Sequence, residues 1–318
     1  MQDSGAGTRA HAPVILVATD LNDLDRLMPF ALRDAAECNG RLILLHVLPA
    51  TSGMAIDPAG MPYYDPTSAL ESAGIALEPW CRAARKKNIA CDALVREGNP
   101  AQQISTSSRQ FLADRILLGT RSRSKLSKLL IGSVAEQVLR SVNLPVITVG
   151  PEAHLPVESS ARQRVVVLAT SFGETSRPSA ALACRIAAGH GAKLVLLHVV
   201  PSVIDKEHAA AGSELGSIAM VQLRALADRV RFADESGHVP IQPLVAHGNP
   251  AIEILATASE LQASLIVLGS THRSAFQSLM RDRTVYRVLA HARCPVLTLR
   301  EPSPSDSPHD VEQLAERF

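Results

Sequence analysis

The chain has 318 residues, a length that fits two domains of ordinary size better than one. Hydrophobic residues make up 46% and charged residues 20% of it, which is the balance of a folded, well-packed protein and argues against a disordered one. The net charge is +1 and aromatic residues reach only 3%. The net charge is too small to attract nucleic acid or an anionic membrane, and the aromatic residues are too few to stack on the bases of a single strand. We therefore predict no nucleic-acid partner and no membrane binding.

Cysteine usage and the lack of a long apolar run bear on the compartment. The five cysteines are odd in number and form no C-x-x-C pair, so we expect neither a disulfide framework nor a zinc site. Cys91 and Cys294 are interpreted as small core residues. No apolar run approaches the roughly 18 residues of a membrane span, and the N-terminal residues lack the apolar region of a signal peptide. We therefore expect a cytoplasmic protein with no membrane association.

The most informative feature of the sequence is an internal repeat, whose offset stays between 150 and 152 residues. The matched segments are VILVATDLND at 14–23 with VVVLATSFGE at 165–174, RLILLHVLP at 41–49 with KLVLLHVVP at 193–201, EGNPA at 97–101 with HGNPA at 247–251, ADRILLGT at 113–120 with ASLIVLGS at 263–270, and NLPVITV at 143–149 with RCPVLTL at 293–299. The order is the same in both copies. The chain is thus predicted to contain two copies of one domain.

The repeat also predicts the domain boundaries. The first domain covers 13–150 and the second 164–300, joined by a Pro- and Ser-containing linker over 151–163. The segment 301–318 begins EPSPSDSP and is predicted to be a flexible tail.

Apolar runs alternate with helical patterns along each copy. In the first copy the expected strands are 14–18, 42–47, 116–118 and 146–149, with a weaker one at 91–95, and the expected helices are 26–38, 68–88 and 101–111. Nearly continuous Val, Ile and Leu runs are typical of parallel strands buried on both faces. We predict an α/β fold with two tandem, doubly wound parallel sheets of Rossmann-like type, whose ligands bind at the carboxyl ends of the strands.

Three local features each have a structural and a functional interpretation, and for the first two we favour the structural one. His46 and His198 occupy matching positions in the second strand of each copy, and we expect each ring to bond to the backbone rather than to act in catalysis. In both GNPA stretches Gly ends a strand, Asn caps a helix and Pro takes its first position. The segment 51–66, which contains Met and Tyr residues, is either a lid over a ligand or a variable connection. The second copy has a segment poor in aromatic residues there, 202–214, and we favour the lid because this asymmetry follows the better-kept site.

Candidate ligand-binding residues follow the first and fourth strands of the first copy. Asp20 comes directly after the first strand, where a carboxylate can accept hydrogen bonds from a ribose or a base amine. Taken alone, the residue favours an Asx turn or a helix cap. The second copy has the uncharged Ser171 there. Gly119 closes the fourth strand, and Gly132 and Ser133 open a helix whose free amides favour an anion. Four cations lie between these glycines, at Arg121, Arg123, Lys125 and Lys128.

The duplicated unit, the GNPA stretches, the LLHVLP and LLHVVP strands and the glycine pattern together resemble a tandem universal stress protein. Members of that family that hold ATP carry Gly, two residues, Gly, nine residues, Gly, and then Ser or Thr. The resemblance implies that Gly119, Gly132 and Ser133 contact the phosphates and ribose and that Asp20 lies near the nucleoside. It also implies backbone contacts from Val47 to adenine and from Val134, with ATP or another adenine nucleotide as the ligand.

The sequence departs from this family pattern at several positions. Ser122 stands where the first copy should have its second glycine, and an added Cβ there costs on the order of 1 kcal/mol if the backbone is left-handed. We expect binding to be weakened rather than lost. The second copy has His272, Asp282 and Arg283 at the later motif positions. Because an aspartate at a helix start repels phosphate, the second site is predicted to be degenerate and structural.

Several functional expectations follow. The chain is predicted to bind an adenine nucleotide in the first domain only, to act in a stress response and to have no enzyme activity. The last strands of the copies, 146–149 and 296–299, are expected to pair in a pseudo-dimer, with a further homodimer left open. Two alternatives remain: a nucleotide-free interaction scaffold, which Ser122 favours, and a slow ATPase. The histidines lack the spacing of metal ligands, so no metal site is predicted.

Overall fold

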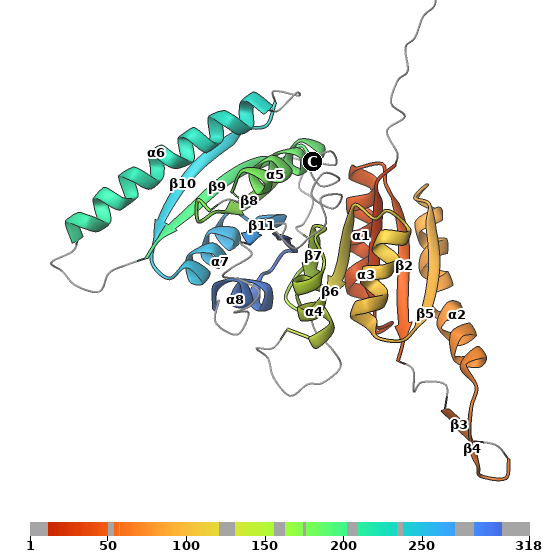
Figure 1. The fold of residues 1–318 in the computed structure, drawn as a ribbon. Helices are drawn as coiled ribbons and strands as arrows, with labels where there is room; N and C mark the ends of the chain where they lie inside the picture. Colours follow the sequence, from red (N-terminus) through yellow and green to blue (C-terminus); the bar gives the residue numbers. More distant parts are fainter. Residues whose placement is uncertain are drawn as a thin grey trace, which may run out of the picture.

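The computed structural model describes residues 12–49, 54–56, 58–120, 131–155, 163–173, 176–201, 209–233, 238–270 and 283–300. Within them, two α/β units share one ten-stranded sheet (Figure 1). The predicted α/β class with two tandem, doubly wound units is confirmed. No helix among the described residues combines the length and apolarity that crossing a bilayer requires.

Both copies have the same order of main elements. In the first copy these are β1 (Val14–Thr19), α1 (Leu24–Glu37), β2 (Arg41–Leu48), α2 (Pro66–Arg85), β5 (Cys91–Glu97), α3 (Pro100–Gln110), β6 (Arg115–Gly119), α4 (Ser133–Ser141) and β7 (Val146–Val149). In the second they are β8 (Val165–Ala169), α5 (Ser176–Gly189), β9 (Lys193–Val200), α6 (Ala209–Ala233), β10 (Ile241–His247), α7 (Pro250–Glu260), β11 (Leu265–Ser270), α8 (Arg283–His291) and β12 (Val296–Arg300). The weak strand predicted at 91–95 is present as β5.

The winding of the first copy reverses between β1 and β6. The strand order is β10-β9-β8-β11-β12-β7-β6-β1-β2-β5, so β1 lies between β2 and β6 and pairs with both in parallel. The chain passes outward from β1 to β2 and β5 and then returns to β6 and β7 on the other side of β1. In sheets of this kind the crevice outside the carboxyl ends of the strands at the reversal is the usual ligand site.

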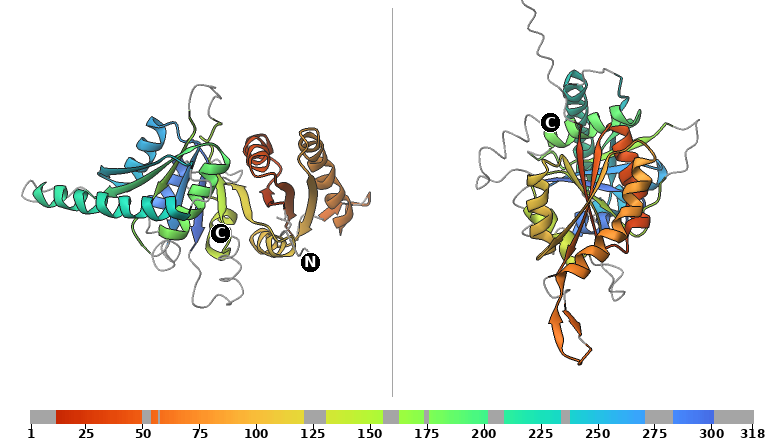
Figure 2. Two further views of the ribbon diagram at one scale, coloured as in Figure 1. Left: turned by 90° about the horizontal axis from the view of Figure 1, so that it is seen from above. Right: turned by 90° about the vertical axis from the view of Figure 1, so that its right-hand side faces the viewer.

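Helices cover both faces of the sheet (Figure 2), and a hydrophobic core lies on each face. Successive side chains of a strand point to opposite faces, and in β1 the side chains of Ile15 and Val17 enter one core while those of Val14 and Leu16 enter the other. Residues of α1, α2, α5 and α6 belong to the first core, and residues of α3, α4, α7 and α8 belong to the second. Each core continues through both copies.

The two copies meet through an antiparallel pairing of β7 with β12, as the sequence predicts. Ile147 is opposite Leu297 at the centre of the pairing. Thr148 donates its hydroxyl hydrogen to the carbonyl oxygen of Val296 over 3.1 Å, and Thr298 donates to the carbonyl oxygen of Val146 over 3.3 Å. These buried hydroxyl groups repeat the pseudo-twofold symmetry at the side-chain level.

A charged cluster joins the copies on one face of this joint. Glu37, in the last turn of α1, forms ion pairs with Arg164 and, over 2.6 Å, with His190 of the second copy. Burial alone would raise the pKa of Glu37, but the hydrogen bond from His190 and the charges of Arg164 and Arg33 hold that pKa below its usual range. The charged form of Glu37 is therefore part of the joint.

The described part of segment 51–66 is a hairpin that projects from the molecule. β3 (Met54–Ile56) and β4 (Pro62–Tyr64) pair antiparallel, and the hairpin extends away from the ten-stranded sheet (Figure 1). It does not cover the carboxyl ends of β1 and β6. The lid interpretation is therefore wrong for the described residues of this segment (Figure 1).

Truncation of a side chain at the joint tests how strongly the copies depend on each other. Leu297 is fully buried, so Leu297→Ala should lower the free energy of unfolding by about 2–5 kcal/mol through lost burial and the resulting cavity. Urea denaturation followed by circular dichroism measures the change. Ile252→Ala, at an exposed position of α7, is the control and should stay within about 0.5 kcal/mol of the natural protein. An equally small effect at Leu297 would contradict a tightly packed joint.

Candidate functional site

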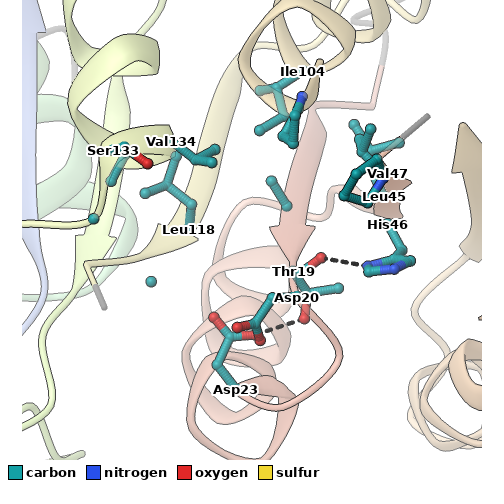
Figure 3. A pocket seen from close by; sticks show the side chains of 16 residues that line it. Thr19, Asp20, Asp23, Leu45, His46, Val47, Ile104, Leu118, Ser133 and Val134 are labelled. Carbon is teal, nitrogen blue, oxygen red and sulfur yellow. Dashed lines mark hydrogen bonds between the residues drawn. The ribbon is translucent and has the colours of Figure 1, made fainter. Parts of the chain in front are cut away.

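A cavity of about 270 Å³ opens at the carboxyl ends of β1, β2 and β6 (Figure 3). The first turns of α3 and α4 close its other sides. It is lined by Ala18, Thr19, Asp20, Asp23, Leu45, His46, Val47, Pro49, Pro100, Ile104, Leu118, Gly119, Gly132, Ser133, Val134 and Ala135. The cavity thus lies at the reversal of the sheet, just below the volume of roughly 300–1,000 Å³ usual for small-molecule sites.

Six of the predicted site residues line this one cavity. They are Asp20, Val47, Gly119, Gly132, Ser133 and Val134. They come from the ends of β1, β2 and β6 and from the start of α4, which the fold brings together from distant parts of the sequence. The other two, Arg121 and Ser122, lie outside the described residues, as do Arg123, Lys125 and Lys128.

One side of the cavity is an apolar slot between β2 and β6. Val47 and Leu45 face Leu118 across it, and Ile104 of α3 closes it from above in the view of Figure 3. Leu45, Leu118 and Ile104 are buried in the second core, so their positions are fixed by packing on the sheet. A slot of this kind accommodates a flat apolar ring.

The backbone of Val47 supplies a polar group at the edge of this slot. Along β2, the amide of Arg41 donates to Pro13 and the amide of Leu42 donates to Ala90, so odd-numbered residues bond toward β1 and even-numbered ones toward β5. The carbonyl of Val47 therefore points to the β1 side. The β1 pairing ends at Thr19, and the amide of Leu21 donates instead to Thr19 Oγ1 over 2.9 Å. The Val47 carbonyl is thereby directed toward the cavity as an acceptor.

Asp20 stands at the mouth of the cavity with its side chain exposed. Its Oδ1 accepts a hydrogen bond from the amide of Asn22 over 2.9 Å, which is the Asx turn expected from the sequence. The turn fixes the carboxylate in place and uses one of its two oxygen atoms. Asp20 can therefore stabilise the turn and accept a hydrogen bond from a ligand at the same time.

The start of α4 lies at the cavity. Gly132 is the N-cap residue and offers no side-chain cap, while its own amide donates to the carbonyl of Thr120 over 2.7 Å. The amides in the first turn of a helix have no partner within the helix, and here those of Ser133 and Val134 lie at the cavity. The positive end of the helix dipole and these amides together favour an anion.

Asp23 is a cavity residue that the sequence reasoning missed. Its Oδ1 accepts a hydrogen bond from Thr19 Oγ1 over 2.6 Å (Figure 3), and a Cβ at Gly119 would come within 2.5 Å of its other carboxylate oxygen. This close approach gives a physical reason for glycine at 119. Burial raises the pKa of Asp23, against the effect of the Thr19 hydrogen bond. In the run DLNDLD, nothing in the sequence distinguishes the partly buried carboxylate of Asp23 from the exposed ones of Asp20 and Asp25.

The structural interpretations of the histidines and of the GNPA stretches are confirmed. His46 Nδ1 lies 2.9 Å from the carbonyl oxygen of Thr19, and His198 Nδ1 lies 2.8 Å from that of Thr170. Gly98 has a φ of +128°, and the side chain of Asn99 accepts a hydrogen bond from the amide of Gln102 at the start of α3. His46 also lines the cavity, so its bond to Thr19 holds the ends of β1 and β2 together there.

The second copy contributes a contact beside the cavity of the first. The amide of Ile131, next to Gly132, donates to the hydroxyl oxygen of Tyr286 over 2.9 Å. Tyr286 lies on α8, so this hydrogen bond crosses between copies and fixes the backbone where α4 begins. In sequence, a tyrosine in an amphipathic helix cannot be told from an ordinary core residue, which is why the contact was not predicted.

The corresponding place in the second copy is only partly described. β11 ends at Ser270 and α8 begins at Arg283, while 271–282, including His272 and Asp282, lie outside the described residues. The degeneracy of this second site therefore stays a prediction from the sequence.

These features define a tandem α/β protein with a cavity at the sheet reversal of its first copy. The universal stress protein family model matches residues 13–150 and 163–300. The chain therefore belongs to the universal stress protein family, with two copies of the domain.

Relatives and solved structures extend this comparison. A universal stress protein of Mycobacterium tuberculosis is 25% identical over 191 residues, which is 59% of this chain and 62% of that relative, so the match spans less than two thirds of the relative. One from Mycolicibacterium smegmatis is 25% identical over 308 residues, 90% of this chain and 96% of the relative. The crystal structure of a universal stress protein from Archaeoglobus fulgidus has a TM-score of 0.67 at 22% identity and covers 91% of this chain and 97% of its own. The structural likeness concerns the fold alone.

The titration of Asp23, which lines the cavity, tests whether its carboxyl group has a raised pKa in the folded protein. Because burial raises its folded pKa above the unfolded value, the stability it contributes is complete below the unfolded pKa and is lost as pH rises through the folded pKa. Asp23→Asn removes this titration. The free energy of unfolding of the variant, relative to the natural protein, should increase as pH rises from below about 3.9 to neutrality.

Urea denaturation at a series of pH values measures this difference. Asp25→Asn, at an exposed position of the same helix, is the matched control. A difference between Asp23→Asn and the natural protein that stays constant over the whole range would contradict a buried carboxylate at this place.

Proposed function

We propose that the first copy binds an adenine nucleotide, with ATP as the leading ligand, and that the second copy supports this site as a structural partner in a stress-response protein. The observation that carries the proposal is the meeting of six predicted residues in one cavity, with an apolar slot at one end and an uncapped helix start at the other. The apolar slot is complementary to the base of a nucleotide, and the helix start is complementary to its phosphates. The two ends of the cavity therefore match the two ends of a nucleotide.

The base fits the slot end of the cavity. Val47, Leu118 and Ile104 offer apolar surface to a flat ring, and the Val47 carbonyl accepts a hydrogen bond from an exocyclic amine such as that of adenine. The ribose then lies near Asp20, whose carboxylate accepts a hydrogen bond from a hydroxyl group.

The phosphates fit the α4 end. The amides of Ser133 and Val134, the Ser133 hydroxyl and the helix dipole favour negative charge there. By their place between Gly119 and Gly132, Arg121 and Ser122 belong to the proposed phosphate site, and the further cations at Arg123, Lys125 and Lys128 add to its attraction for anions. The function is proposed as binding, since backbone amides and apolar surface are its main elements.

Nucleotide binding is tested by measuring it in the natural protein and in one variant, which carries a residue of the second copy. The purified protein should carry an adenine nucleotide, or bind ATP in calorimetry. Gly132→Asp introduces the residue that the second copy has at the matching position, Asp282. Aspartate is a favourable N-cap, so the helix should fold while the new charge repels phosphate. We expect the dissociation constant for ATP to rise at least about tenfold, or 1.4 kcal/mol.

Gly74→Asp is the matched control, because it makes the same change on α2, where a Cβ meets nothing within 4 Å. It should bind ATP as the natural protein does. The absence of any co-purified nucleotide, together with no heat at millimolar ATP, would overturn the proposal. Equal affinity of Gly132→Asp and Gly74→Asp would overturn the assignment of phosphate to α4.

The contact from Tyr286 predicts that the second copy contributes to affinity. Tyr286→Phe removes the acceptor for the Ile131 amide, which leaves the start of α4 less fixed. The loss of one hydrogen bond, about 0.5–1.5 kcal/mol, predicts an approximately two- to tenfold weaker binding of ATP in calorimetry. Arg287→Gln, at an exposed position of the same helix, should bind normally. If the natural protein binds ATP and Tyr286→Phe binds it with the same affinity, the contribution of Tyr286 is contradicted, and the proposed nucleotide site is not.

A further inference from the structure

Two cysteines of the first copy meet on one face of the sheet, away from the cavity. Cys81 lies in α2 and Cys91 is the first residue of β5, and both side chains are buried. Their sulfur atoms are 3.1 Å apart. The S–S bond of a disulfide is about 2.05 Å, so a small movement of either side chain brings the two sulfurs to bonding distance. The sequence reasoning predicted no disulfide and did not place these residues together.

The backbone holds the two thiols in this position. β5 is the last strand of the sheet and pairs only with β2 among the described residues, while α2 packs against it (Figure 1). Arg85, one turn after Cys81, donates from Nε and Nη2 to the carbonyl oxygen of Cys91 over 3.0 and 2.7 Å. This arginine fixes the end of α2 on the start of β5 and keeps the thiols facing each other.

The second copy has the same arrangement without sulfur. Arg231 of α6 donates to the carbonyl oxygen of Ile241, the first residue of β10, over 3.0 Å, as Arg85 does to Cys91. Four residues before Arg231 stands Ala227, which is buried like Cys81. An alanine and an isoleucine therefore satisfy the packing at this place, so the fold does not require the thiol pair.

We propose that Cys81 and Cys91 are a redox modification site, at which a peroxide converts the two thiols into a reversible disulfide. The thiolate of one cysteine attacks a peroxide oxygen to give a sulfenic acid, and the released hydroxide takes a proton to become water. The sulfur of the other cysteine then attacks the sulfur of the sulfenic acid, and the hydroxyl group leaves as a second water with the proton of that second thiol. The thiols lose two electrons in all, and hydrogen peroxide is reduced to two molecules of water.

The environment distinguishes the two sulfurs. The hydrogen bond from Cys91 and the charge of Arg85 lower the pKa of Cys81, against the effect of burial. The Cys81 interaction and burial raise the pKa of Cys91. The two thiols therefore differ in acidity.

The cross-link would tie α2 to the edge strand. By closing a loop it restricts the unfolded chain and should raise the melting temperature. It lies at the amino end of β5, whereas the cavity lies at the carboxyl ends of the strands. The inference is therefore independent of nucleotide binding, and either can fail without the other.

Thiol counting and peptide mapping test the proposal. The reduced protein is treated with hydrogen peroxide, alkylated after unfolding and digested without reductant. Of five thiols, three should remain, and one linked pair of peptides should contain Cys81 and Cys91. Dithiothreitol should restore all five. Cys38, Cys184 and Cys294 serve as internal controls and should stay unlinked.

The double variant Cys81→Ala, Cys91→Ile installs the residues of the second copy and should fold. The peroxide should raise the melting temperature of the natural protein and leave that of the double variant unchanged. Recovery of both residues as thiols or as unlinked sulfinic acids, or a disulfide to any other cysteine, would overturn the proposal. A Cys81–Cys91 disulfide without a shift in melting temperature would overturn its effect on stability.

Discussion

The antiparallel pairing of β7 with β12 is the interaction on which the rest of the molecule depends. It turns two five-stranded sheets into one, and it lets each hydrophobic core run from the first copy into the second. Buried threonine hydroxyls satisfy carbonyl groups on both sides of the seam, so the polar backbone is buried there without loss of hydrogen bonds. The charged cluster around Glu37 closes the same seam on one face.

This arrangement gives the two copies different constraints. Residues of the second copy at the joint, such as Leu297 and Tyr286, contact the first copy and are held by packing and hydrogen bonding. Residues at the matching cavity positions of the second copy have changed, with Ser171 in place of an aspartate and Asp282 in place of a glycine. Under the proposed function, the second copy keeps its surface toward its partner and has lost the chemistry of its own site.

Local sequence patterns were sufficient for much of the fold. Runs of Val, Ile and Leu predicted the strands, the GNPA stretches predicted the caps of α3 and α7, and the repeat predicted which strands join the copies. In the site, six of eight residues could be placed in one cavity because the carboxyl ends of parallel strands meet at one edge of the sheet.

The misses have a common physical origin. The hydrogen bond between Ile131 and Tyr286 joins residues 155 positions apart, and the contact of Cys81 with Cys91 joins a helix to a strand. Such contacts depend on how elements pack, which a period of 2 or 3.6 residues does not report. The pairing of β3 with β4 in the segment 51–66 likewise depends on contacts that the sequence pattern does not report.

Because β7 and β12 belong to one chain, their pairing does not depend on the concentration of the protein. Two separate chains joined by the same pairing would come apart as their concentration falls, and the hydrogen bond from Ile131 to Tyr286 would be lost with them. In a single chain the partner is always present at a fixed effective concentration. The cavity of the first copy therefore keeps its support from α8 at any abundance of the protein, from a few molecules per cell upward.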